Sequence, residues 1–138
     1  MTQRYYLDTS IWLDFFENRD EPNLPKGKFA EKLISSIISE DKRIIYSDAV
    51  KDELLDIGYN YNEIEELFMP LIKVLIFLES TKKQFGKAKD ISAKRDIPLF
   101  DALHALMARD SKSVMITRDA HFKKLKDVIG HKKPEDII

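Results

Sequence analysis

The sequence predicts an α/β domain in which helices wrap a central, mainly parallel sheet of four or five strands. Short β-rich runs alternate with amphipathic segments along the chain, and this alternation is typical of parallel strands joined by helices. The 138 residues contain no repeat and no long linker, so we expect a single domain over residues 1–138. A hydrophobic content of 43% is enough to build one core.

The first predicted strand is followed by two helices. The run RYYL (4–7) is rich in strand formers, and SIWLDFFE (10–17) carries its apolar residues at helical spacing. Residues 20–27, DEPNLPKG, contain prolines and a glycine and are predicted to form a loop. Residues 28–40 repeat their apolar side chains with the period of a helix.

A second strand, RIIYS (43–47), ends in a serine that is suited to cap the helix after it. That helix covers residues 48–57 and stops at Gly58, because glycine readily ends a helix. A further helix over 61–68 ends before Pro70, which cannot continue it.

The second half of the chain repeats the pattern. Lysines dominate its first helix, whereas its second begins at Pro98, a residue favoured in the first helical turn. The tail, residues 128–138, is compatible with one more edge strand. The other predicted elements here are a strand over 72–77, helices over 81–95 and 98–110, a strand over 113–117, and a turn or short helix over 118–125.

Composition excludes several classes of site. Without cysteine the chain has no disulfide, thiolate zinc site or cysteine nucleophile, which suits a reducing cytoplasm. Its four glycines form neither a phosphate-binding loop nor a dinucleotide fingerprint. The most apolar run, residues 67–78, is interrupted by Pro70 and Lys73, and the N-terminus lacks the pattern of a signal peptide. We therefore expect a cytoplasmic protein without a membrane partner.

Four acidic residues stand out by position. Asp8 follows the first predicted strand and Asp119 closely follows the fourth, so both lie at the carboxyl edge of a parallel sheet, where ligands bind. Glu53 lies in the second turn of the helix that leaves the second strand. Asp101 lies in the first turn of an otherwise apolar helix. Asp52 competes with Glu53, but the apolar stripe of their helix places Glu53 at its border.

Each acid also has a purely structural interpretation. Asp8 would cap the following helix, although Thr9 and Ser10 are better placed to do so. Asp101 would favour the positive end of its helix, and Asp119 would serve a turn. A functional site therefore depends on the combination rather than on any one of them.

The segments YLDTSIWLDFFE, SDAVKDELLD, IPLFDALHALMA and VMITRDAHFKKL resemble, in order and spacing, the PIN-domain nucleases. The similarity spans nearly the whole chain and is greatest to the small toxin ribonucleases (VapC-type) of toxin–antitoxin modules. It implies a PIN-like three-layer α/β/α fold, a cognate antitoxin and a homodimer. It also implies that Asp8, Glu53, Asp101 and Asp119 form the acidic metal site, with Ser10 and Thr117 at the hydroxyl positions beside the first and last acid.

The chemistry of such a cluster favours a divalent cation. Two carboxylates about 6 Å apart repel by about 3 kcal/mol at an effective dielectric constant near 20, and several such pairs would rival the stability of a domain. Hard oxygen ligands without cysteine favour Mg²⁺ or Mn²⁺. Such a site suits hydrolysis of RNA phosphodiester bonds, with Asp8, Asp101 and Asp119 as ligands and Glu53 completing the site or orienting water.

An RNA substrate would need local positive charge, since the net charge of the chain is −1. Arg118, Lys123 and Lys124 neighbour Asp119 and are the candidates for phosphate contacts. The lysines of helix 81–95 are interpreted as a solvated face. His104, one turn after Asp101, is interpreted as a packed or hydrogen-bonded side chain.

Two alternatives remain open. One is a non-catalytic PIN-like module that binds RNA or protein, although such a module has no need for concentrated negative charge. The other is a phosphatase with Asp8 as nucleophile, which expects a second aspartate where this chain has Ser10.

Overall fold

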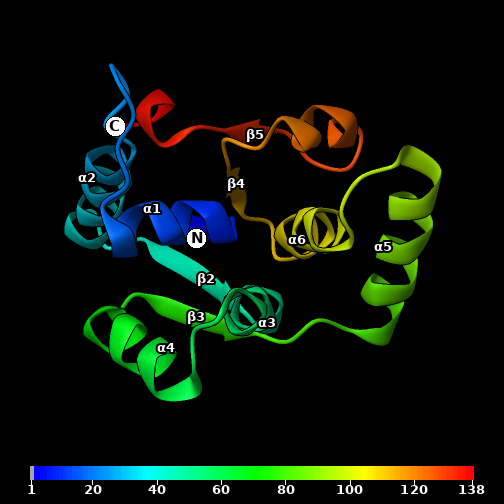
Figure 1. Cartoon of the computed structure of the whole chain (residues 1–138), viewed down its shortest axis with the longest axis horizontal. Coiled ribbons are helices and arrows are strands. Elements are labelled where there is room, and N and C mark those ends of the chain that lie inside the picture. The colour runs from blue at the N-terminus through cyan, green and yellow to red at the C-terminus, as the bar shows by residue number, and fades with distance from the viewer. Residues whose placement is uncertain (1) are drawn as a thin grey trace.

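The computed structural model describes residues 2–138, and within them five strands form one parallel sheet in the order β3-β2-β1-β4-β5 (Figure 1). Every pairing in the sheet is parallel. The predicted sheet is therefore confirmed, and the tail supplies its fifth, edge strand. The strands are β1 (Arg4–Leu7), β2 (Arg43–Ser47), β3 (Leu75–Leu78), β4 (Val114–Ile116) and β5 (His131–Lys132).

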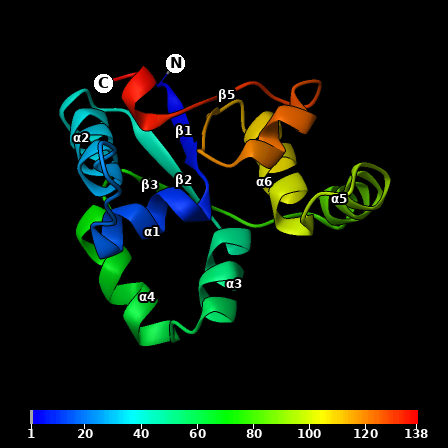
Figure 2. The same cartoon turned by 45° about the horizontal axis from the view of Figure 1, so that its top comes forward.

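Helices cover both faces of the sheet, which confirms the predicted α/β/α layers (Figure 2). α1 and α2 lie on one face, and α5 and α6 lie on the other. The helices are α1 (Thr9–Glu17), α2 (Lys26–Ser39), α3 (Asp48–Ile57), α4 (Tyr61–Phe68), α5 (Lys82–Arg95) and α6 (Leu99–Asp110). Short 3₁₀ helices are η1 (Met69–Leu71), η2 (Ala120–Leu125) and η3 (Pro134–Asp136). No helix among residues 2–138 is long and apolar enough to cross a membrane.

The strand order reverses at β1. The chain moves from β1 to β2 and β3 on one side, then returns to place β4 and β5 on the other. Residue Leu7 pairs with Ile116, so Asp8 and Thr117 leave neighbouring strands at the same level. A backbone hydrogen bond of 3.0 Å from Asp8 N to Ile116 O extends this pairing beyond β1. The switch point therefore brings the loops after β1 and β4 together, where parallel sheets bind ligands.

The central strands are buried on both faces. Tyr6, Leu7, Ile44, Ile45 and Met115 have no exposed surface, as expected where helices cover a parallel sheet on both sides. Beside them, the aromatic ring of Trp12 packs edge-on against Phe68 and stacks on Phe16. Trp12 is fully buried and so belongs to the core.

Several boundaries differ from prediction by one or two residues, and the start of β3 differs by three. α1 and α2 begin slightly earlier, at Thr9 and Lys26. β3 begins later, at Leu75, because the preceding backbone is used in a turn: Ile72 N donates to Met69 O and Val74 N to Leu71 O. An apolar run alone does not distinguish this turn from a strand.

Gly27 lies where α2 begins and packs against the end of α1. A Cβ atom added there would lie 2.7 Å from Asn18 Cα and 2.4 Å from Asn18 Oδ1. Gly27 N also donates to Arg19 O at 2.7 Å, so the two backbones are held together. The close approach of α1 and α2 therefore depends on the missing side chain.

We expect Gly27→Ala to lower the free energy of unfolding by about 1–3 kcal/mol, because the methyl group overpacks the contact between the two helices. Gly86→Ala in α5 is the matched control, since nothing lies within 4 Å of its added Cβ. That exchange should stabilise the protein by roughly 0.5–1 kcal/mol through helix propensity. Urea denaturation of both variants measures the difference, and equal effects of the two would contradict the packing argument.

Candidate metal centre

Asp8 has a buried carboxylate that is held by two hydroxyl groups. Ser10 Oγ donates to Asp8 Oδ2 at 2.9 Å, and Thr117 Oγ1 donates to the same oxygen at 2.8 Å. Burial raises the pKa of Asp8, while the charge of His104 and the two hydroxyl bonds oppose that rise. Asp8 is the N-cap residue of α1, yet its side chain makes no capping bond. The carboxylate thus points into the centre and not onto the helix.

Thr9 and Ser10 do not cap α1, contrary to the expectation from sequence. The helix already begins at Thr9, and both hydroxyl groups donate to carboxylates instead: Ser10 to Asp8, and Thr9 Oγ1 to Glu53 Oε1 at 2.7 Å. A buried carboxylate needs such donors, and the first turn of α1 is served by the Asp8 carbonyl oxygen, which accepts from Ile11 N at 2.9 Å.

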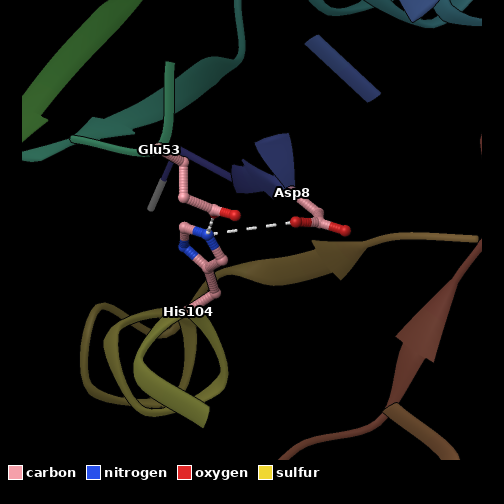
Figure 3. A group of neighbouring side chains, drawn as sticks. All are labelled: Asp8, Glu53 and His104. Atoms are coloured by element: carbon pink, nitrogen blue, oxygen red, sulfur yellow. Dashed lines mark hydrogen bonds and ion pairs between the residues drawn. The ribbon is translucent and has the colours of Figure 1, made fainter. Parts of the chain in front are cut away.

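Glu53 reaches the centre from α3, and Asp52 beside it is exposed. Glu53 Oε1 forms a hydrogen bond with Nε2 of His104, and the same nitrogen lies 3.9 Å from Asp8 Oδ1. Figure 3 shows the three side chains entering one space from three different segments of the chain. One ligand atom from each of Asp8, Glu53 and His104 lies within 4.8 Å of the others, so these residues form the first potential metal-binding group.

A chain of buried polar groups lies behind His104. Its Nδ1 is 2.6 Å from Tyr6 Oη, which in turn is 2.7 Å from Ser47 Oγ. Ser47 also caps α3 by accepting from Val50 N at 3.2 Å, as its position in the sequence predicted. Sequence reasoning did not place Tyr6 or His104 in the site. The available signal was a histidine one helical turn after Asp101 in an otherwise apolar segment.

Asp101 and Asp119 form the second group together with His121. One ligand atom from each of the three lies within 4.8 Å of the others. His121 Nδ1 is 3.1 Å from Asp101 Oδ2 and 2.8 Å from Asp119 Oδ1. The sequence analysis did not identify His121, although its spacing of two from Asp119 was a usable signal. Its side chain is exposed, unlike that of His104.

Asp101 is the acid with the least favourable surroundings. It is 6% exposed, and its Oδ2 accepts no hydrogen bond from the described part of the chain. Burial, followed by the charge of Asp119, raises the pKa of Asp101 to about 8. The charges of Asp8 and Glu53 act in the same direction, so the two groups influence one another.

Asp119 combines a structural bond with its position in the centre. Its Oδ1 accepts from His121 N at 2.8 Å and so caps η2, which matches the turn interpretation of this residue. Its own backbone N–H donates to Thr117 Oγ1 at 3.0 Å. Thr117 therefore joins the loop after β4 to Asp8 through a single hydroxyl group.

The residues present fit a divalent cation. Oxygen donors dominate both groups, and the buried Asp101 Oδ2, which makes no well-directed hydrogen bond in the described chain, requires a positive partner or a proton; His121 Nδ1 lies 3.1 Å from it. A cation placed among these acids would remove the repulsion that raises the pKa of Asp101. The arrangement can thus hold metal at the carboxyl edge of the sheet.

The guanidinium group of Arg118 is paired with carboxylates and is therefore not available to bind a phosphate. Its guanidinium group forms a double ion pair with Glu135 of η3 at 2.7 Å, and its Nε lies 3.8 Å from Asp14 of α1. Only 14% of its side chain is exposed. Lys123 and Lys124 on η2 are exposed. The contacts of Arg118 therefore tie the C-terminal segment to the domain.

Comparison with known proteins identifies both a family and a set of similar structures. The family model described as PIN domain matches residues 5–128. VapBC-1 from nontypeable Haemophilus influenzae is similar with a TM-score of 0.66 and 21% identity, covering 96% of this chain and 99% of that one. A toxin–antitoxin complex from Klebsiella pneumoniae is similar with a TM-score of 0.65 and 17% identity, covering 94% of this chain and 97% of that one.

VapBC2 from Rickettsia felis, solved with a DNA fragment from the promoter, gives a TM-score of 0.65 and 15% identity, with coverage of 92% and 96%. At these identities the structures establish a shared fold. A search of curated protein sequences finds no match.

We expect the metal-free protein to lose stability relative to Asp101→Asn as the pH rises. The folded-state pKa of Asp101, about 8, exceeds its ordinary value of 3.8. In the pH interval between these two values, the native state therefore holds a proton on Asp101 that the unfolded state has released. The difference in unfolding free energy should grow by at most about 1.4 kcal/mol per pH unit.

Denaturation in EDTA across this pH interval measures that difference, with Asp90→Asn on the exposed surface of α5 as the control. A constant difference between Asp101→Asn and wild type would show that Asp101 is already ionised at the lower end of the interval.

Proposed function

The chain belongs to the PIN-domain family, and from this premise we propose that it is a metal-dependent endoribonuclease that hydrolyses RNA phosphodiester bonds. The observation that carries the proposal is the gathering of Asp8, Glu53, Asp101 and Asp119 from segments far apart in the sequence. Concentrating these acids in a partly buried space costs stability, which a binding module has no reason to accept.

Asp8, Asp101 and Asp119 are the proposed ligands of Mg²⁺ or Mn²⁺. Their oxygens are hard donors, and the buried Asp101 Oδ2 makes no well-directed hydrogen bond among residues 2–138, although His121 Nδ1 lies 3.1 Å away. When bound, such an ion lowers the pKa of a coordinated water and neutralises negative charge on the phosphate. Ser10 and Thr117 oppose the rise in the pKa of Asp8 that burial causes and fix the direction of its carboxylate, since both donate to its Oδ2.

Glu53 is proposed to complete the shell of the ion, directly or through the attacking water that it orients. Its Oε1 is occupied by Thr9 and His104, so one carboxylate oxygen is held and the other remains to accept a proton or a hydrogen bond. In the reaction, the water oxygen forms a bond to phosphorus, the bond from phosphorus to the leaving ribose oxygen breaks, and that oxygen takes up a proton. The proton released by water passes to the acidic cluster or to solvent.

Lys123 and Lys124 are the proposed contacts to RNA phosphates. Both are exposed on η2, which starts at the Asp119 cap, and Lys124 Nζ also donates to Arg95 O at 3.4 Å. We do not assign this role to Arg118, because Glu135 neutralises its guanidinium group.

A place in a toxin–antitoxin module is proposed from the fold. The similar structures include a toxin–antitoxin complex and two VapBC assemblies. We propose that this chain is the toxin, with a cognate antitoxin and a homodimer as its assemblies in the cytoplasm. Exposed apolar side chains at the β3 edge, among them Met69, Ile72 and Phe77, suit protein partners.

Asp8→Asn and Asp101→Asn should each abolish Mn²⁺-dependent cleavage of RNA, because each removes a proposed ligand. Asp52→Asn is the matched control, since it removes one charge from the exposed side of α3 beside Glu53. Incubation of purified protein with total RNA, in Mn²⁺ or EDTA, measures cleavage and maps the ends. Unchanged cleavage by both ligand variants would refute the site, and absent cleavage by the wild type would favour a binding module.

Replacing both Lys123 and Lys124 by alanine should weaken RNA binding. The slope of log K against log salt concentration should become shallower by the equivalent of about two phosphate contacts. The same exchange at Lys87 and Lys89, which are exposed on α5, is the control for net charge. Binding measured at several salt concentrations separates the two variants. Equal losses in both would show that RNA responds to the overall charge and not to η2.

A further inference from the structure

His104 is a fully buried titratable side chain to which the proposed reaction assigns no role. It has no exposed surface, and its ring packs beside those of Tyr6 and Phe100. Both ring nitrogens meet polar atoms: Nδ1 lies 2.6 Å from Tyr6 Oη, and Nε2 is hydrogen-bonded to Glu53 Oε1. Figure 3 shows the ring placed between Glu53 and Asp8. The question is which nitrogen carries the proton.

The partners on the Nε2 side answer it. A bare Nε2 would direct its lone pair at the carboxylate of Glu53, and the carboxylate of Asp8 lies 3.9 Å away as well. The ionised carboxylate of Glu53 can accept but cannot donate, so this contact is a hydrogen bond when Nε2 carries the hydrogen. A doubly protonated ring keeps this same bond, so Nε2 is a donor whatever the charge of the ring.

The partners on the Nδ1 side complete a one-directional chain. Burial raises the pKa of Tyr6, so its phenol retains its proton and can donate to Nδ1. Tyr6 Oη then accepts from Ser47 Oγ at 2.7 Å. In this arrangement Ser47 donates to Tyr6, Tyr6 to His104, and His104 to Glu53, and every proton of the chain has an acceptor.

We propose that His104 is a positioning residue of the centre, whose Nε2–H, fixed by Tyr6, holds Glu53 in place for the reaction and does not bind metal. The inference rests on the proposed metal-dependent function and deepens it. Glu53 has a long side chain that is 24% exposed, and its Oε1 is fixed from two sides by His104 and Thr9. The freedom that remains to its carboxylate is therefore small.

The position of His104 on α6 explains why one helix can align two acids. Asp101 lies three residues earlier on α6, so both side chains project from the same face. Asp101 contributes its own carboxylate, and His104 fixes the carboxylate that α3 contributes. A shift of α6 would thus move both acids of the centre together.

The protonation of His104 can be read directly from long-range ¹H–¹⁵N spectra of the full chain, without any measurement of activity. The chain has three histidines, and loss of one pattern in His104→Gln assigns the signal. We expect a protonated Nε2 in the metal-free protein and again after addition of Mg²⁺. A bare Nε2 in either state would overturn the proposal, because a metal ligand must lose that hydrogen.

Two substitutions separate positioning from packing. His104→Leu removes the donor, and we expect it to weaken the binding of Mn²⁺ alone about ten- to a hundredfold, as for other partners that orient metal-binding groups. His104→Gln keeps an amide N–H that can reach Glu53 and should restore most of the affinity. Melting temperatures of both variants in EDTA show whether a loss of Mn²⁺ affinity merely follows a loss of folding, because leucine leaves Tyr6 Oη and Glu53 Oε1 without this partner.

Calorimetry with Mn²⁺ measures the affinity, and thermal melts in EDTA measure the folding. Equal Mn²⁺ affinity of His104→Leu and wild type, or no advantage of glutamine over leucine, would overturn the proposal.

A double-mutant cycle tests whether His104 acts through Glu53. In a Glu53→Gln background, His104→Leu should cause little further loss of Mn²⁺ affinity, since the group it positions is already altered. Additive losses would overturn the proposal. If the wild type binds Mn²⁺ but cleaves no RNA, the proposed function fails, while the spectra and the cycle still decide the role of His104.

Discussion

Asp8 carries a carboxylate that folding removes from water, and this burial constrains the architecture around it. An ionised carboxylate inside a protein must receive hydrogen bonds or a cation, because desolvation otherwise favours its neutral form. Here the donors are Ser10 and Thr117, which lie more than a hundred residues apart in the sequence. Their meeting depends on the pairing of Leu7 with Ile116, so the register between β1 and β4 and the ionisation of Asp8 are physically linked.

The same constraint extends to the opposite side of the centre through hydrogen bonds that cross helices. Thr9 binds Glu53 of α3, and His104 of α6 binds the same carboxylate oxygen. Tyr6 joins His104 to Ser47, which also caps α3. Tyr6 of strand β1 thus belongs to the buried network, and Asp8, which directly follows β1, contributes an acid to the centre. Such satisfied buried networks fix a single arrangement where apolar packing would permit several.

Charge is arranged locally in this protein and not across the whole molecule. The chain is nearly neutral, yet acids gather at the carboxyl edge, and η2, which begins at the Asp119 cap, carries exposed lysines. Arg118 shows why position along the chain does not predict such a role. It follows Thr117 directly, but its guanidinium group turns to Glu135 and stabilises the C-terminal segment. Because this ion pair is bidentate and shielded from solvent, the guanidinium group is not free to contact a phosphate.

The sequence by itself determined the alternation of strands and helices, the parallel sheet, and the acids that occupy the carboxyl edge. These features depend on periodicity, caps and chain order, which local residues encode: Ser47 caps α3, Gly58 ends it, and Asp8 follows β1. Only the tertiary structure decided which groups meet. It excluded Asp52 in favour of Glu53, turned Thr9 and Ser10 from helix caps into carboxylate donors, and placed His104 and His121 among the acids. Side-chain direction and burial set these contacts, and both depend on packing between segments that the linear pattern does not relate.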